Sequence, residues 1–308
     1  MNKKIAVIGA GNVGASCAQY LAEANLGDIV MIDIIEGFPQ GKALDLTQAG
    51  PVRGYNCMVT GSNNYKDIKG ADLVIMTAGM PRKPGMSRED LLAMNADIVG
   101  AAAKNIKKYA PKSFVIVVSN PLDIMTYHMM KVTGFSTNRI CGQAGILDST
   151  RFRAFVAMEL GVAMTEVHAM VMGGHGDTMV PLPRYTTVGG IPIKELISAK
   201  RIKEISERTR LGGGEIVKLL KKGSAYYAPA AASVDMARAI LCDEKRVFPC
   251  SAYLTGQYGI KDIYIGVPIV LGGNGVEKVL ELKLNASESK ALKASAVNYR
   301  GVLKEIGY

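Results

Sequence analysis

One stretch decides the fold class of this chain: Ile5-Ala6-Val7-Ile8-Gly9-Ala10-Gly11-Asn12-Val13-Gly14. Its first four residues are an apolar run that glycine ends, which is typical of a buried parallel strand. Residues 12 to 25 have a helical pattern, and a second apolar run begins at Ile29 and ends at Asp33. A strand, a glycine turn, a helix and a second strand predict the first unit of a doubly wound, parallel α/β sheet.

The turn in this stretch has the GxGxxG spacing of a dinucleotide-binding site. Gly9 allows the tight turn, Gly11 lets a pyrophosphate approach the helix N-terminus, and Gly14 allows the helix to pack closely on the strand. The carboxylate of Asp33 can accept hydrogen bonds from both ribose hydroxyls and would repel a 2′-phosphate. We therefore expect NAD rather than NADP as the cofactor; the alternative is a glycine-rich turn beside a surface aspartate. The cofactor-binding residues predicted here are Gly9, Ala10, Gly11, Asn12, Val13, Gly14 and Asp33.

The rest of the first half continues the alternation of strands and helices. Residues 72–76 and 114–118 are two more candidates for buried strands. A helical pattern runs between them from Ser87, which is a good N-cap, to about Lys108. This alternation predicts a Rossmann domain over residues 1–144.

The pattern changes after residue 144, and we expect a second, α+β domain over residues 145–308. Its predicted helices are 148–160, 201–220, 230–240 and 285 to about 306. Its predicted strands are a hairpin over 186–193 with a Gly-Gly turn and an antiparallel pair, 263–271 and 276–282. No repeat or long linker separates the two domains, so we expect them to pack closely.

Composition and charge exclude several classes of protein. With 308 residues, 48% of them hydrophobic and 21% charged, the chain is globular rather than fibrous or disordered. No apolar run approaches the ~18–20 residues of a membrane span, and the four apolar residues after Lys4 are too few for a signal peptide. The net charge is +10, but glutamates interrupt the densest basic stretch, residues 200–222, as on a solvated helix face. We therefore expect neither a membrane nor a nucleic acid as a partner.

Five cysteines lie far apart in the sequence, at positions 17, 57, 141, 242 and 250. They form no CxxC pair, which argues against a disulfide framework or a zinc site. We expect buried, inert thiols in a reducing cytoplasm, and no metal site.

One of the three histidines, His175, lies among glycines in the segment Gly173-Gly174-His175-Gly176-Asp177. Glycines around a histidine indicate that a ligand comes close to the main chain. His128 and His168 lie in apolar helix and strand patterns instead, which are typical of packed side chains. His175 is therefore the histidine that we expect at a functional site.

Asp148 and Arg151 open the first predicted helix of the second half, and their i, i+3 spacing places them on one helix face. The alternative is a surface ion pair at a helix start. A histidine, whose reference pKa is about 6.5, suits the proton transfer that accompanies hydride transfer. A neighbouring carboxylate would orient that histidine, and an arginine can hold a substrate carboxylate through two parallel hydrogen bonds.

Polar residues at the predicted carboxyl edge of the sheet extend this candidate site. Asn120-Pro121 ends a buried strand at that edge, where doubly wound folds bind ligands, and we predict a cis peptide bond between the two residues. The loop over residues 78–88 also leaves a strand end, and it carries Arg82, Lys83 and Arg88. Three cations on such a loop indicate a lid over an anionic substrate.

Together these motifs resemble the lactate/malate dehydrogenase family, and the resemblance extends over nearly the whole chain. The segments that carry it are GAGNVG, the strand end at Asp33, TAGMPRKPGMSR, SNP, LDSTR and GGHGD. Within the family, the sequence is most similar to the lactate-dehydrogenase-like, NAD-dependent malate dehydrogenases of bacteria and archaea. The resemblance implies reversible oxidation of malate to oxaloacetate, a reaction of the tricarboxylic acid cycle, by a homodimer or homotetramer.

The resemblance also implies the roles of individual residues. His175 would be the proton donor and acceptor, and Asp148 would orient it. Arg151 would hold the substrate carboxylate, Arg88 would polarise the carbonyl, and Asn120 would contact the reacting oxygen. The residues implied to flank the cofactor are Asn95, Val118, Ser119 and Asn120.

Arg82 would discriminate between substrates, because malate dehydrogenases have arginine at this position and lactate dehydrogenases usually have glutamine. L-Lactate dehydrogenase is therefore the nearest alternative. An NAD-dependent glycosidase would need a metal, and no cluster of histidine and cysteine here suggests one. A catalytically inactive NAD-binding protein would have lost His175, Asp148 or Arg151, and all three are present.

Overall fold

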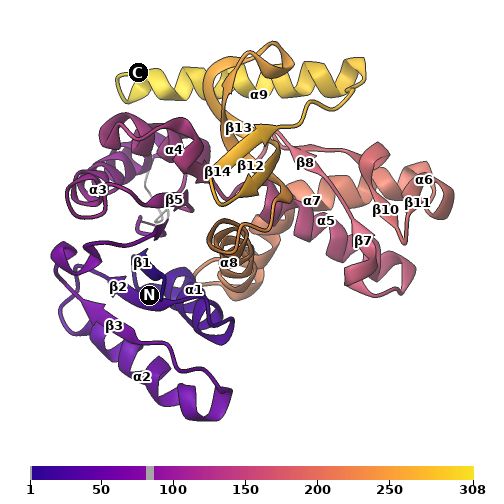
Figure 1. Cartoon of the computed structure of the whole chain (residues 1–308). Coiled ribbons are helices and arrows are strands. Elements are labelled where there is room, and N and C mark those ends of the chain that lie inside the picture. Colours follow the sequence, from indigo (N-terminus) through magenta and orange to yellow (C-terminus); the bar gives the residue numbers. More distant parts are fainter. Residues whose placement is uncertain (1, 81–86) are drawn as a thin grey trace.

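The computed structural model describes residues 2–80 and 87–308, and a nine-stranded sheet runs through it (Figure 1). Six parallel strands form the first part of this sheet, in the spatial order β6-β5-β4-β1-β2-β3. They are β1 (Lys4–Ile8), β2 (Asp28–Ile32), β3 (Val59–Ser62), β4 (Leu73–Met76), β5 (Phe114–Val117) and β6 (Ile140–Gly142). Because β1 pairs with both β2 and β4, the strand order reverses beside β1, as in a Rossmann sheet. The predicted fold class is confirmed.

Helices cover both faces of these parallel strands. They are α1 (Asn12–Glu23), α2 (Phe38–Arg53), α3 (Arg88–Tyr109) and α4 (Leu122–Thr133). Helix α1 packs against α8 (Tyr227–Leu241) on one face, and α3 packs against α4 on the other (Figure 1). Ser87 caps α3 as predicted: its hydroxyl accepts a hydrogen bond from the Asp90 amide, and the Asp90 carboxylate accepts one from the Ser87 amide.

The second part of the chain contributes further helices and strands. Its helices are α5 (Gly145–Leu160), α6 (Ile193–Leu196), α7 (Ala199–Leu220), α8 and α9 (Ala286–Glu305). Its short strands are β7 (Val167–His168), β8 (Val171–Met172), β9 (Val180–Pro181), β10 (Thr187–Val188) and β11 (Ile191–Pro192), and its long strands are β12 (Arg246–Thr255), β13 (Lys261–Gly272) and β14 (Gly275–Val279). The predicted hairpin is confirmed, since β10 and β11 pair around Gly189 and Gly190, which both have positive φ. Short 3-10 helices lie at Tyr65–Ile68, Thr137–Arg139, Met164–Glu166, Pro183–Tyr185 and Gln257–Gly259.

The long antiparallel strands do not form a separate sheet. They continue the parallel one, because β12 pairs with β6 where Ser251 faces Gly142. A Cβ atom on Gly142 would lie 2.8 Å from the Cβ of Ser251, so only glycine allows the two strands to come this close. The two parts of the chain therefore share one sheet and pack closely, as expected.

The basic stretch of residues 200–222 forms most of α7, and its arginines pair with nearby glutamates. Arg201 is paired with Glu159, and Arg208 is paired with Glu215. The predicted solvated helix face is confirmed. Among the described residues, no helix is both long and apolar enough to cross a membrane.

All five cysteines are free thiols, but they are not all buried as expected. Burial raises the pKa of Cys17 and of Cys141 to about 12, which makes both thiols inert. Cys242, however, is exposed, because it follows the last residue of α8 at the surface. The expectation for His168 was also wrong: its side chain is exposed, since β7 has only two residues and buries Val167 instead.

Candidate active site

Predicted site residues of the first half lie together at the carboxyl edge of the parallel strands. Gly9 follows β1, Asp33 follows β2, and the segment from Val118 to Asn120 follows β5. The strand order reverses between β1 and β4, which is the position where doubly wound sheets bind their ligands. The peptide bond between Asn120 and Pro121 is cis, as predicted.

The glycine turn after β1 has the shape that a dinucleotide requires. Gly9 has a φ of 98°, and a Cβ atom on Gly14 would lie 1.8 Å from the carbonyl oxygen of Gly9. In contrast, a Cβ atom on Gly11 would meet nothing within 4 Å. Gly11 is the N-cap of α1 and provides no side chain to cap its first turn, so the open space lies at a helix N-terminus. The turn therefore fits the pyrophosphate of NAD.

Asp33 stabilises this turn directly. One oxygen of its carboxylate accepts a hydrogen bond from the Ala10 amide at 2.8 Å, and the other accepts one from the Ile35 amide at 3.1 Å. Each carboxylate oxygen has a second lone pair, so both can still accept from ribose hydroxyls. Asn63 donates to the carbonyl oxygens of Asp33 and Ile35 and fixes the segment after β2. The sequence analysis did not predict this role for Asn63.

Asn95 is buried and joins two loops at the sheet edge. Its side-chain amide donates to the carbonyl of Asn120 at 2.8 Å and accepts from the Met80 amide at 2.7 Å. Ser119 is also buried, and its hydroxyl donates to the carbonyl of Ala78 at 2.6 Å. The side chain of Val118 is half-buried and packs on the core, whereas that of Asn120 is exposed at the edge. Asn95 and Ser119 thus hold the loops that would flank a cofactor.

His175, Asp148 and Arg151 are brought together into one array. His175 lies in the loop between β8 and β9, and its Nδ1 is 2.9 Å from one carboxylate oxygen of Asp148. The other oxygen of Asp148 accepts a hydrogen bond from Arg151 at 3.1 Å. The side chain of His175 is 14% exposed, that of Asp148 is 2% exposed and that of Arg151 is 13% exposed. Asp148 and Arg151 are therefore not a surface ion pair, which was the alternative interpretation. Because Nδ1 faces Asp148, Nε2 is the nitrogen left for a substrate.

The surroundings of His175 favour its protonated form. Burial lowers the pKa of His175, but the charge and the hydrogen bond of Asp148 raise it more. Arg151 opposes the protonated form, and the buried carboxylate of Asp123 supports it. The net effect is a pKa above the ordinary value for histidine, which suits a residue that donates a proton near neutral pH.

The glycines beside His175 serve packing more than ligand approach. A Cβ atom on Gly174 would lie 2.0 Å from the ring of Tyr299, and Gly173, whose φ is 82°, pairs with Gly266 of β13. Only at Gly176 would a Cβ atom meet nothing within 4 Å. The glycines did indicate a special histidine, but at Gly173 and Gly174 the close neighbour is the protein itself.

Arg151 lies against a run of three glycines in the middle of α7. A Cβ atom on Gly212 would lie 3.2 Å from Cδ of Arg151, and one on Gly213 would lie 3.5 Å from its Nη2. A Cβ atom on Gly214 would meet nothing within 4 Å. Helix α7 therefore leaves room for the guanidinium beside Asp148.

The loop that carries the other predicted cations is not described. Arg82, Lys83 and the residues around them lie outside the described residues, and so does the side chain of Arg88. The predictions of a lid and of a discriminating arginine stay predictions.

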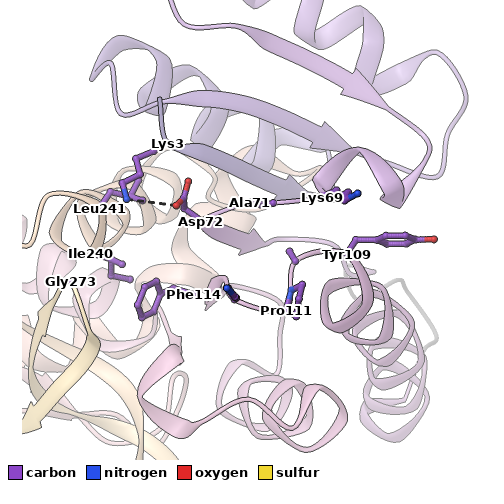
Figure 2. A pocket seen from close by; sticks show the side chains of 13 residues that line it. Lys3, Lys69, Ala71, Asp72, Tyr109, Pro111, Phe114, Ile240, Leu241 and Gly273 are labelled. Carbon is purple, nitrogen blue, oxygen red and sulfur yellow. Dashed lines mark ion pairs between the residues drawn. The ribbon is translucent and has the colours of Figure 1, made fainter. Parts of the chain in front are cut away.

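The pocket in Figure 2 lies at the opposite edge of the sheet from this site. Its lining includes Lys3 before β1, Asp72 before β4 and Phe114 at the start of β5, so it opens at the amino ends of the strands. None of the predicted site residues that the structure describes is part of its lining. It is separate from the candidate active site.

Comparisons with known proteins agree with this geometry. Residues 3–142 match the family model for the NAD-binding domain of lactate/malate dehydrogenases, and residues 146–306 match the model for their α/β C-terminal domain. A malate dehydrogenase from Methanosarcina mazei is 59% identical over 96% of this chain and 97% of its own length.

Two solved structures are similar over almost the whole chain. A malate dehydrogenase from Cryptosporidium parvum is 47% identical with a TM-score of 0.97, covering 99% of both chains. A lactate dehydrogenase from the same organism, complexed with lactic acid and NAD, is also 47% identical, with a TM-score of 0.95 and coverage of 99% and 98%. The chain therefore belongs to the lactate/malate dehydrogenase family and uses NAD as its cofactor.

Proposed function

We propose that this chain is an NAD-dependent malate dehydrogenase, which interconverts (S)-malate and oxaloacetate. The observation that carries the proposal is the buried array of His175, Asp148 and Arg151, in a chain whose glycine turn also fits NAD. Curated relatives that are 54% to 59% identical to the chain are named malate dehydrogenase, which supports this substrate over others in the family.

In malate oxidation, His175 takes the hydroxyl proton on Nε2 while Asp148 holds Nδ1 and stabilises the imidazolium that forms. In the reverse direction, the protonated His175 donates to the carbonyl oxygen of oxaloacetate. Bound NAD would supply the redox chemistry, as the partner that exchanges a hydride with C2 of the substrate.

Arg151 holds one carboxylate of the substrate with its planar guanidinium, which fixes C2 for hydride transfer. Asn120, exposed at the sheet edge, contacts the reacting oxygen. Arg88 polarises the carbonyl, and Arg82 pairs with the second carboxylate; the sequence and the family resemblance support these two roles. The residues that would hold NAD are those of the glycine turn and Asp33, with Asn95, Val118, Ser119 and Asn120 flanking it.

The second candidate is lactate dehydrogenase, because a lactate dehydrogenase is as similar in sequence to this chain as a malate dehydrogenase from the same organism. The test is oxidation of NADH, followed by its absorbance, with oxaloacetate, with pyruvate and without substrate. We expect kcat/KM for oxaloacetate to exceed that for pyruvate by at least ~10³-fold, the effect of one buried charge pair. A preference for pyruvate would favour the second candidate. NADH binding without turnover of either acid would indicate an inactive NAD-binding protein.

The assembly proposed for this enzyme is a homodimer or homotetramer in the cytoplasm, contributing to the tricarboxylic acid cycle. The family resemblance supports the assembly, and five free thiols are compatible with a reducing compartment. Sedimentation velocity at micromolar concentration would distinguish dimer, tetramer and monomer.

A further inference from the structure

Side chains from two other helices fix the main chain of the loop that carries His175. The Gly174 amide donates to the hydroxyl of Ser295 at 2.9 Å, and the hydroxyl of Tyr299 donates to the carbonyl of His175 at 3.0 Å. Both of these side chains belong to α9. From the other side, the His175 amide donates to the carboxylate of Asp123, on α4, at 2.8 Å. The position of the imidazole is thus set by groups far from it in sequence.

Of these three partners, only Asp123 has a carboxyl group, and the residue is 1% exposed. Its second oxygen accepts a hydrogen bond from the hydroxyl of Ser251 at 2.6 Å. It also follows Asn120 by only three residues, at the start of α4. One buried carboxylate therefore connects the segment of Asn120 with the loop of His175.

Ionisation of Asp123 does not stabilise the fold. Burial raises the pKa of Asp123 above its ordinary value, although hydrogen bonds from Ser251 and the His175 amide oppose the rise. A group whose pKa is raised by folding contributes stability that is present below its unfolded pKa and lost as the pH rises through its folded pKa. Ionisation of the buried Asp123 carboxyl therefore costs stability, whereas an asparagine would have nearly the same shape and no charge.

We propose that Asp123 is a positioning residue for His175: it fixes the histidine main chain against the segment of Asn120, and its charge adds to that of Asp148 in favouring the protonated imidazole. This proposal rests on the role of His175 given under Proposed function. Among the residues that the structure describes, the charged or titratable groups near His175 are Asp148 and Arg151 from α5, Asp123 from α4, Tyr299 from α9 and Asp177, exposed in the same loop.

The first test is the pH profile of kcat/KM in Asp123→Asn. Oxaloacetate reduction needs protonated His175, so its rate falls as the pH rises through the pKa of that residue. Without the charge of Asp123, this fall moves to lower pH. We expect a loss of about tenfold at pH 8.5 and less than about threefold at pH 6, as one nearby charge gives at an intermediate effective dielectric constant. The rising limb for malate oxidation moves in the same direction. A purely structural role would lower the rates equally at every pH.

The second test does not depend on activity. The chain has three histidines, so imidazole NMR with His128→Asn and His168→Asn for assignment can follow the titration of His175 alone. We expect His175 to titrate at lower pH in Asp123→Asn than in the wild type. If His175 titrates as expected but its replacement leaves catalysis intact, the proposed function fails, whereas the effect of Asp123 on the protonation of His175 is still supported. If the His175 titration does not move, the inference is wrong whatever the enzyme does.

Three further variants separate charge from packing. Asp45→Asn removes a charge from the exposed face of α2 and should leave the pH profile unchanged. Ser295→Ala removes the acceptor of the Gly174 amide but no charge, so it should lower kcat without moving the profile. Ser251→Ala leaves one oxygen of Asp123 without its donor and makes ionisation less favourable. It should move the profile in the same direction as Asp123→Asn, which keeps the test decisive if that variant does not fold. If Asp45→Asn shifted the pH profile of kcat/KM as much as Asp123→Asn does, the proposal would be wrong.

Discussion

The cofactor turn and the proton-transfer array lie in the same family fold but are assembled differently. Asp33 reaches the Ala10 amide across 23 residues of sequence, within one strand-helix-strand unit. The contacts of His175 with Asp148, Asp123 and Tyr299 span 27, 52 and 124 residues. The first region is a local motif that carries its own geometry, whereas the second exists only when α4, α5 and α9 have packed. Damage to each region should therefore have a different signature.

The largest effect is expected when the second region loses its proton carrier. His175→Asn should lower kcat/KM for oxaloacetate by ~10²–10⁴-fold, the usual contribution of a general acid or base. NADH affinity should change little, because the glycine turn is a separate local unit. Steady-state kinetics and a fluorescence titration with NADH measure the two quantities.

The matched control for this variant is His168→Asn, since His168 is exposed on β7. It should retain full activity. Near-full activity of His175→Asn, or an equal loss in NADH affinity, would break the comparison between the two regions.

A second prediction concerns the loop over residues 78–88, which lies between the two regions in the sequence. A dianionic substrate enclosed without a second cation leaves one charge unpaired, and pyruvate would leave Arg82 unpaired instead. Arg82→Gln should therefore shift the preference for oxaloacetate toward pyruvate by ~10²-fold or more. The measurement is kcat/KM for both acids.

Lys83→Gln is the control, because Lys83 is cationic and adjacent. If the loop is extended, successive side chains point in opposite directions, and we then expect Lys83 to face away from the substrate. If Lys83→Gln changes the ratio and Arg82→Gln does not, the discriminating residue has been assigned incorrectly.

The same comparison explains how far the sequence could predict this molecule. The strand before Gly9, the helix after it and Asp33 were predicted because hydrophobic period and glycine spacing are local signals. Strand β3, helix α2 and strand β6 were not predicted: β3 and β6 have four and three residues, and α2 has no strong apolar face. Such elements depend on neighbours for their stability.

The proton-transfer array shows which contacts the sequence could not predict. His175 could be predicted from the glycines around it. The spacing of Asp148 and Arg151 also fitted a surface ion pair, and the resemblance to the family joined the three residues into one set. Asp123 gave only the weak signal of an acid at the start of a mostly apolar helix, and Tyr299 gave none. Their hydrogen bonds to the His175 main chain depend on tertiary packing across 52 and 124 residues, which no window of sequence contains.

A third prediction tests the local region from within. Asp33→Ser should weaken NAD binding and reduce the preference for NAD over NADP, each on the order of tenfold, because a carboxylate near the ribose is removed. Asp33 also accepts hydrogen bonds from the amides of Ala10 and Ile35, so part of the loss comes from the turn itself.

Asp33→Asn separates these two causes, since it retains one acceptor but not the charge. It should recover much of the NAD affinity and still show the relaxed preference, as measured by titration with both cofactors. An unchanged ratio of NAD to NADP affinity in both variants would show that Asp33 does not face the ribose.

The smallest effect is expected in α7, which lies against Arg151 of the second region. Two of its glycines provide a pair of matched variants. Gly212→Ala and Gly214→Ala add the same methyl group to the same helix, and each should gain ~0.5–1 kcal/mol of helix stability from the loss of a glycine. Only at Gly212 would the new Cβ lie 3.2 Å from Cδ of Arg151, which must then move away from its position beside Asp148. Gly214→Ala should therefore raise the free energy of unfolding and leave KM for oxaloacetate unchanged. Gly212→Ala should raise KM about two- to fivefold, the scale of a displacement of a few tenths of an ångström in a charged contact, with NADH affinity unchanged. Equal KM values in the two variants would mean that α7 does not position Arg151, and that the second region depends on α4, α5 and α9 alone.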